Sequence, residues 1–252
     1  MRIRASDHET TVTVRATRGP AEGRRVFAYD VRGHGTAADA PKPFTMAGTA
    51  ADLVAVLDAL ELETAHVAGL SLGGAIAQAA AVAAPERFAS LTLMAAPDRP
   101  VPEAFEERAR VAETEGMAAL VEPTLERWFT AAALAADTEG VRYARDCVAS
   151  FEPATWASIW RGYGGLDVYE RLRDFTAPAP AIAGGADASI PVDGMAAIAA
   201  RIGDGARSRC CPVRRTSRRW NAPKRWPTPW AGSSPRRSTS RNLGGCLATW
   251  NR

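Results

Sequence analysis

Histidine is scarce in this chain of 252 residues. The three copies, His8, His34 and His66, all lie in its first 66 residues. Cysteine is nearly as rare, and four cysteines in a chain of this length do not make a disulfide framework. Three of the four gather near the C-terminus without C-x-x-C spacing or a nearby histidine. A structural zinc site is therefore excluded there, and we expect no metal.

Long apolar runs are also missing. The N-terminus carries Arg2, Arg4 and Asp7 with no apolar segment behind them, unlike a secretory leader. The most apolar stretch, residues 65–84, is mostly alanine and glycine and contains Gln78, which does not suit a membrane span. We therefore expect a cytoplasmic protein without a membrane partner.

Acidic residues are absent from the last 46 residues. Residues 1–206 carry 19 Lys and Arg against 28 Asp and Glu, a net charge of −9. Residues 207–252 carry 12 Lys and Arg and no acid, a net charge of +12, together with four of the seven tryptophans. We therefore separate 207–252 as a basic tail. It has no helical apolar stripe, so we expect it to be frameshifted or disordered.

The preceding sequence follows the pattern of an α/β domain. Short apolar runs at Val26–Tyr29, in AHVAGL (65–70) and in ASLTLMAAP (89–97) predict buried strands. Between them, TAADLVAVLDALEL has apolar residues at helical spacing, with Thr49 as its predicted N-cap, and LGGAIAQAAAVAAPERF predicts a second helix. This alternation predicts a mostly parallel sheet with helices on both faces.

Residues 98–173 lack strand patterns and predict a helical insertion, or cap, over the sheet. A strand at 179–183 and a helix in DGMAAIAARI follow. We therefore divide the chain into an atypical N-terminal segment (1–23), an α/β core (24–97 and 174–206), the cap (98–173) and the tail (207–252). Within the first segment, TTVTVRATRGP alternates like an exposed strand.

A lone serine stands in a glycine-flanked turn between the second predicted strand and the second predicted helix. Gly69-Leu70-Ser71-Leu72-Gly73 fits G-x-S-x-G. The residues two before and two after such a serine should have almost no side chain, because they would clash with the packed helix and strand. The turn lifts the serine oxygen above the sheet and points the Leu72 N–H at a developing oxyanion. We predict a nucleophile at Ser71; the alternative is a structural Gly-Ser turn.

With YDVRGHG (29–35) before this turn and APERF (84–88) after it, the chain resembles the α/β-hydrolase family over roughly residues 24–205. The cap sequence GMAALVEPTLERWFT (116–130) is similar to that of 3-oxoadipate enol-lactonases. The resemblance implies a cofactor-free hydrolase of a small ester or lactone, active in aromatic degradation through an acyl-enzyme. It also implies an acid in a late G-x-x-D turn, which Asp187 matches. Trp128 and Trp160 either line the pocket, as cap aromatics do in this family, or belong to a helical core.

The family's histidine, which follows the acid, has no counterpart here, although a serine hydroxyl needs a base near neutral pH. Read one base earlier with GC-rich codons, VRRTSRRWNAPKRWPTPWAG (213–232) can spell GAAHLAALERPEAVADAVGG. That string is similar to the family's histidine loop and last helix. We therefore expect a frameshift near Arg207, little or no activity, and loss of the edge strand and last helix. The strand and H-G loop that supply the second oxyanion donor are also missing from 1–23, which predicts an N-terminal truncation.

Other interpretations stay open. A cofactor-free haloperoxidase or a C–C bond hydrolase would use the same serine, and an inactive hydrolase-like scaffold would use none. The basic tail with its tryptophans suits nucleic acid, although nothing upstream resembles a nucleic-acid module. We expect Asp30 and Arg32 to hydrogen-bond backbone, with substrate contact as the alternative for Arg32. The sequence leaves the oligomeric state open.

Overall fold

The computed structural model describes residues 2–5, 8–11, 14–17, 25–99, 101–185, 187, 189–202 and 210–213, with backbone alone for 2–17 and 210–213. The strands are β1 (Arg2–Ala5), β2 (His8–Thr11), β3 (Val14–Thr17), β4 (Val26–Tyr29), β5 (Ala65–Leu70), β6 (Phe88–Met94), β7 (Ala181–Gly184) and β8 (Cys210–Val213). The α-helices are α1 (Met46–Ala59), α2 (Leu72–Ala83), α3 (Pro102–Glu115), α4 (Ala118–Trp128), α5 (Ala131–Ala135), α6 (Glu139–Ala149), α7 (Pro153–Gly164) and α8 (Val192–Arg201). Short 3₁₀ turns are η1 (Gly35–Ala37), η2 (Pro85–Arg87) and η3 (Arg171–Asp174).

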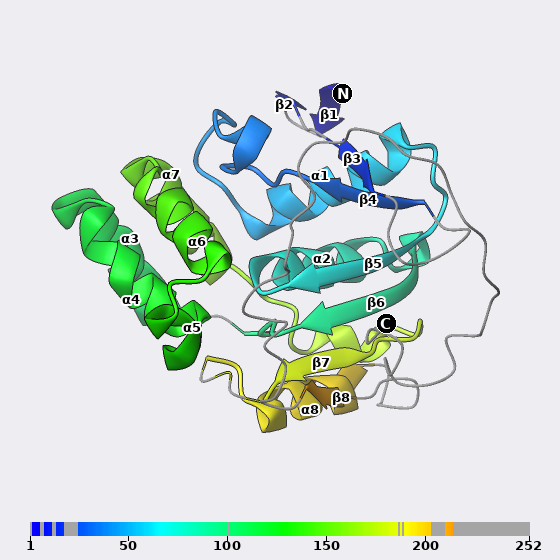
Figure 1. Cartoon of the computed structure of the whole chain (residues 1–252). Coiled ribbons are helices and arrows are strands. Elements are labelled where there is room, and N and C mark those ends of the chain that lie inside the picture. The colour runs from blue at the N-terminus through cyan, green and yellow to red at the C-terminus, as the bar shows by residue number, and fades with distance from the viewer. Residues whose placement is uncertain are drawn as a thin grey trace, which may run out of the picture.

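The central sheet is parallel and has the order β5-β6-β7-β8 (Figure 1). It confirms the predicted parallel strands and their helical connections. The expected place of β4 was wrong: β4 pairs antiparallel with β3, with Val14 opposite Tyr29, and belongs to a separate two-stranded sheet. Among the described residues no strand bridges β4 and β5, so the alternating sequence pattern did not translate into one continuous sheet.

The two faces of this sheet differ. Leu91, Leu93, Ala181 and Ala183 are fully buried in a core shared with α2 and α8, and β5 and β6 lie in front of α2 in Figure 1. The opposite face is outside that core, and its residues on β5 are exposed: His66, Ala68 and Leu70. Helices on both faces were expected, but over the β5 and β6 part of the sheet the described helices cover one face.

Helix α1 begins earlier than expected. Thr45, not Thr49, is its N-cap, and the Thr45 hydroxyl accepts a hydrogen bond from the Gly48 N–H at 3.0 Å. Thr49 lies inside the helix, buried, with its hydroxyl donating to the Met46 carbonyl at 3.0 Å. Both threonines can cap a helix, and the earlier one prevails because the buried stripe already begins at Met46.

The expected loss of the edge strand was also wrong. Cys210–Val213 forms β8 and pairs in parallel with β7, so that Ala181 lies opposite Cys210. A short segment with β-branched and apolar residues can therefore occupy the open edge of β7 even within the basic tail. The rest of the tail, together with the nucleic-acid alternative, lies outside the described residues.

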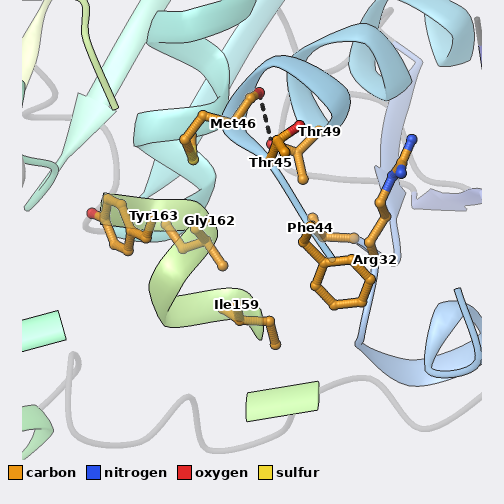
Figure 2. Close-up of a pocket in the computed structure, with 10 residues that line it drawn as sticks. Arg32, Phe44, Thr45, Met46, Thr49, Ile159, Gly162 and Tyr163 are labelled. Carbon is orange, nitrogen blue, oxygen red and sulfur yellow. Dashed lines mark hydrogen bonds between the residues drawn. The ribbon is translucent and has the colours of Figure 1, made fainter. Parts of the chain in front are cut away.

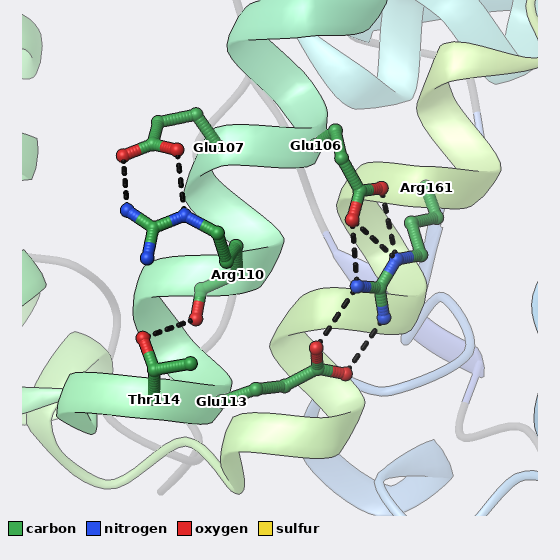
Figure 3. Close-up of polar contacts among 6 residues, drawn as sticks. All are labelled: Glu106, Glu107, Arg110, Glu113, Thr114 and Arg161. Atoms are coloured by element: carbon green, nitrogen blue, oxygen red, sulfur yellow. Dashed lines mark hydrogen bonds and ion pairs between the residues drawn. The ribbon is translucent and has the colours of Figure 1, made fainter.

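The predicted cap is helical throughout, from α3 to α7, with its own buried cluster that includes Leu125, Val141 and Trp156. Figure 1 shows these helices beyond the C-terminal ends of β5 and β6. Arg161 of α7 joins two glutamates of α3: its Nε lies 3.0 Å from Glu106 Oε2, and its Nη1 lies 2.6 Å from Glu113 Oε1 (Figure 3). The cap therefore stands over the sheet edge where parallel strands place their loops.

Candidate active site

Ser71 occupies a strained turn at the end of β5. Its backbone has φ 50° and ψ −117°, a region that residues with a side chain rarely adopt. The Ser71 N–H donates to the Met94 carbonyl at 2.9 Å, and its carbonyl accepts the first helical bond from Ala75. Ser71 is exposed to solvent. The hydroxyl is therefore presented above the strand ends, as the motif predicts for a nucleophile.

The glycines of the turn do not contribute equally. A Cβ on Gly69 would collide with the Gly73 carbonyl, and a Cβ on Gly74 would collide with Ala96. A Cβ on Gly73 would meet nothing within 4 Å. The predicted steric reason thus holds for Gly69 and is wrong for Gly73, because the crowded helix position is the next one along.

Leu72 is the first residue of α2, and a helix leaves its first N–H groups without an internal acceptor. The positive end of the helix dipole adds to the attraction for a negative charge. The Leu72 N–H thus meets the chemical requirements of the predicted oxyanion donor beside the serine.

Asp187 lies at the same edge of the sheet, three residues after β7 ends. Its Oδ1 accepts hydrogen bonds from the Ser189 N–H at 2.9 Å and the Ile190 N–H at 3.0 Å, which hold the carboxylate in place. Strands β5 and β7 lie two strand spacings apart, which is about 10 Å, so the turns that carry Ser71 and Asp187 follow strands separated by that interval. That interval has room for one imidazole ring between the two groups.

The two histidines whose side chains the structure describes, His34 and His66, form contacts with residues other than Ser71. His66 is the second residue of β5, five residues from Ser71 and so about 16 Å away along an extended strand, and its Nδ1 lies 2.8 Å from Ser90 Oγ. The neutral His34 ring donates from Nδ1 to the Arg32 carbonyl at 3.1 Å and packs edge-on against Phe151, and burial lowers the pKa of His34. The His8 side chain lies outside the described part of the chain.

Helix α7 packs against the loop before α1 through two contacts with Phe44. The Phe44 N–H donates to Ser158 Oγ at 2.8 Å. At Gly162 a Cβ would come within 2.7 Å of the Phe44 carbonyl, so the helix and the loop backbone meet closely. A small pocket remains between them, and Leu72 is one of the residues that line it. Figure 2 shows Phe44, Gly162 and Tyr163 at this pocket.

The cap brings only one of the two predicted tryptophans to this place. Trp160 is half-buried, and its ring stacks on Tyr163 at 6.0 Å and lies 5.1 Å from Phe105. Trp128 is 51% exposed at the end of α4 and makes no ring contact with this group among the described residues.

Tyr163 was not predicted as a site residue, although it is a cap side chain that lines the pocket beside the serine turn. Leu72, the residue after Ser71, lines the same pocket. The signal available in the sequence was an aromatic stripe on α7, with Trp156, Trp160 and Tyr163 at spacings of four and three. Such a stripe normally indicates core packing, and only the docking of α7 reveals that its last member faces the turn.

Of the two charged residues in the YDVRGHG loop, Asp30 meets the expectation, because its Oδ2 accepts from the Thr36 N–H at 3.0 Å. Arg32 instead forms a buried ion pair with Asp52, with Nη2 2.8 Å from Oδ1. No set of three His, Cys, Asp or Glu side chains gathers as a metal site in the described ranges. No helix among the same residues is long and apolar enough to cross a membrane.

A family model described as the alpha/beta hydrolase fold matches residues 15–200. A 3-oxoadipate enol-lactonase of Acinetobacter baylyi is 34% identical over 167 residues, which cover 65% of this chain and 61% of that protein. A second enol-lactonase of the same organism is 28% identical, again over 61% of its length. The chain thus spans about three fifths of the length of these relatives.

Solved structures agree with this match. The enol-lactonase of Burkholderia xenovorans superposes with a TM-score of 0.75 at 26% identity, over 84% of this chain and 91% of that one. An esterase of Thermogutta terrifontis gives a TM-score of 0.74 at 25% identity, over 84% and 89%.

Proposed function

This chain belongs to the α/β-hydrolase fold family, and from that premise we propose that it hydrolyses a small ester or lactone at Ser71 through an acyl-enzyme. The observation that carries the proposal is the exposed Ser71 on its strained turn, with Asp187 two strands away at the same sheet edge. The likeness to enol-lactonases supports a substrate similar to 3-oxoadipate enol-lactone.

The reaction follows from these positions. Ser71 Oγ attacks the substrate carbonyl carbon while its proton passes to a base, and the carbonyl electrons move to an oxyanion beside the Leu72 N–H. The oxyanion then collapses, the C–O bond to the leaving alkoxide breaks, and that alkoxide takes the proton from the base. Water repeats the sequence on the acyl-enzyme and frees Ser71.

The base is the missing part. Strand β8 is parallel to β7, so the chain leaves Val213 at the same edge as Ser71 and Asp187. A histidine soon after Val213 is therefore well placed to stand between the serine and the acid. The shifted reading frame supplies one at the position of Thr216, and we propose that the active form of this protein carries it. Without it we expect very slow hydrolysis, because removing the base costs a serine hydrolase about six orders of magnitude.

The test exchanges residues 213–232 for GAAHLAALERPEAVADAVGG and follows release of p-nitrophenol from p-nitrophenyl acetate. We expect the exchange to raise kcat/KM by at least about 10³-fold, and Ser71→Ala in the exchanged chain to abolish the gain. The matched control is the same exchange with GAAALAALERPEAVADAVGG, which differs only by the histidine. Equal rates for the two exchanged chains would contradict the proposed base, and hydrolysis that survives Ser71→Ala would contradict the proposed nucleophile.

A further inference from the structure

Two arginines of the cap differ from the others because no acidic side chain pairs with them. Helices α3 to α7 carry six arginines, and four of these form ion pairs with carboxylates: Arg110, Arg142, Arg145 and Arg161. Figure 3 shows the pairs of Arg110 and Arg161. Arg108 of α3 and Arg127 of α4 form no ion pair within the described part of the chain. The difference marks these two as positions where a bound anion would supply the opposite charge.

Both of these side chains are half-buried. Burial, together with the neighbouring positive charge of Arg108, lowers the pKa of Arg127 to about 10, and burial also lowers the pKa of Arg108. Both side chains nevertheless keep their charge at neutral pH. Two like charges that are partly removed from water and repel each other are unfavourable unless an opposite charge joins them. An anion beside both arginines would therefore be attracted by each.

The two charges meet at one ring, the indole of Trp160 on α7. Arg108 Cζ lies 4.4 Å from the ring centroid, and Arg127 Cζ lies 5.9 Å from it. Attraction to the π electrons of an indole uses none of the N–H donors of a guanidinium. Among the described residues, Arg127 Nη2 donates one long hydrogen bond to Thr124 Oγ1 at 3.4 Å, and Arg108 donates none. Most of their donors are therefore available to a ligand.

Trp160 connects this pair of arginines to the serine turn. It packs against the buried cluster of the sheet and against that of the cap, so it lies where the two meet. Its ring stacks on Tyr163 with centroids 6.0 Å apart, and Tyr163 lines a pocket together with Leu72, which follows Ser71. Contacts between neighbouring side chains thus lead from the arginines to the place where the ester would react.

We propose that Arg108 and Arg127 bind a free carboxylate of the substrate, so that the preferred esters and lactones are those that carry one. This inference rests on the proposed function. A guanidinium presents its N–H groups in a planar fork that matches the two oxygens of a carboxylate. The indole of Trp160 offers apolar surface to the carbon chain between the carboxylate and the reacting carbonyl. The two arginines hold the substrate and exchange no proton with it.

The first test measures binding without chemistry. Monomethyl adipate, which carries one carboxylate, and dimethyl adipate, which carries none, are titrated by calorimetry into the full chain with Ser71→Ala. We expect monomethyl adipate to bind at least about 10-fold more tightly, because charge-assisted hydrogen bonds hold its carboxylate. Arg108→Met and Arg127→Met should each remove most of this difference and leave the affinity for dimethyl adipate within about twofold. Equal affinity for the two ligands in the Ser71→Ala chain overturns the inference without any arginine variant.

Arg110→Met is the matched control, since Arg110 lies on the same helix as Arg108, is exposed and already pairs with Glu107. It should leave both affinities unchanged. An equal loss with Arg110→Met would show that net charge, and not this site, attracts the carboxylate.

The second test gives the same two esters to the chain with the exchanged tail. A preference for monomethyl adipate that Arg127→Met removes through a higher KM supports the inference, whereas equal kcat/KM for both esters overturns this inference alone. If neither ester is hydrolysed while the Ser71→Ala chain still prefers monomethyl adipate, the proposed function fails and the carboxylate site stands.

Discussion

The β5–α2 turn and the α3–α7 pair of the cap border the same pocket, through Leu72 and Tyr163, but they are built in different ways. The bend itself is determined by atoms close in sequence, because a Cβ on Gly69 would collide with the Gly73 carbonyl on the other side of Ser71. Gly74 is the exception, since a Cβ there would collide with Ala96, which follows β6. The cap joins residues about 50 positions apart, through Arg161 with Glu106 and Glu113. The reacting group therefore comes from local geometry, whereas its surroundings come from packing between distant segments.

The largest effect that we expect is a difference in stability between alanine substitutions at two glycines of the same motif, Gly69 and Gly73. Gly69→Ala forces a Cβ against the backbone of Gly73, so we expect the free energy of unfolding to drop by about 3 kcal/mol, or folding to fail. Gly73→Ala has open space and a helical position, so its free energy of unfolding should stay equal or rise by up to about 1 kcal/mol. Urea unfolding at 25 °C measures both. Similar losses at the two positions would show that crowding does not govern this turn.

A smaller effect should come from the ion pairs that hold the cap. Arg161→Met removes both glutamate contacts, and because all three side chains are exposed we expect the melting temperature to fall by no more than about 3 °C. The hydrogen bonds from Arg161 lower the pKa of Glu106 and of Glu113. Their contribution is therefore present above the ordinary glutamate pKa and is lost as the pH falls through the lowered folded-state values.

The difference between Arg161→Met and the parent chain should accordingly begin to shrink as the pH falls below the ordinary glutamate value of about 4.3, and it should also shrink in about 1 M salt. Arg142→Met serves as the control, since Arg142 pairs with Asp137 within the cap and does not link α3 to α7. A loss larger for Arg142→Met than for Arg161→Met would mean that the α3–α7 link is not held by charge.

The smallest effect concerns the place where the loop before α1 touches the cap. Burial lowers the folded-state pKa of His34, whose ring packs edge-on against Phe151, below the value of about 6.5 in an unfolded chain. The unfolded state therefore binds the proton first, and the stabilisation by neutral His34 is lost as the pH falls below about 6.5. We expect His34→Gln to flatten the fall in melting temperature between pH 7 and pH 5. An unchanged slope would show that His34 titrates as an exposed histidine.

Several local features could be predicted from the sequence. The strands at Val26–Tyr29 and Ala65–Leu70, the serine turn and the helical cap follow from apolar runs and glycine positions, and the structure has them where expected. Features that depend on contacts between segments distant in the sequence could not be predicted in this way. A strand pattern does not say which strand lies beside it, so β4 was expected in the parallel sheet and instead pairs antiparallel with β3. Likewise the edge of β7 accepted Cys210–Val213 from the basic tail.

The amino-acid sequence by itself determined the sharp bend at Ser71, because a strand, a helix and nearly absent side chains within a few residues leave the backbone one way to turn. Only the tertiary structure decided that Asp187 stands at the same sheet edge and that Tyr163 lines a pocket with Leu72. The physical reason is distance along the chain. Steric exclusion acts between residues close in sequence, so short motifs are enough to predict it. The relative placement of residues 71, 163 and 187 depends instead on how whole helices and strands pack.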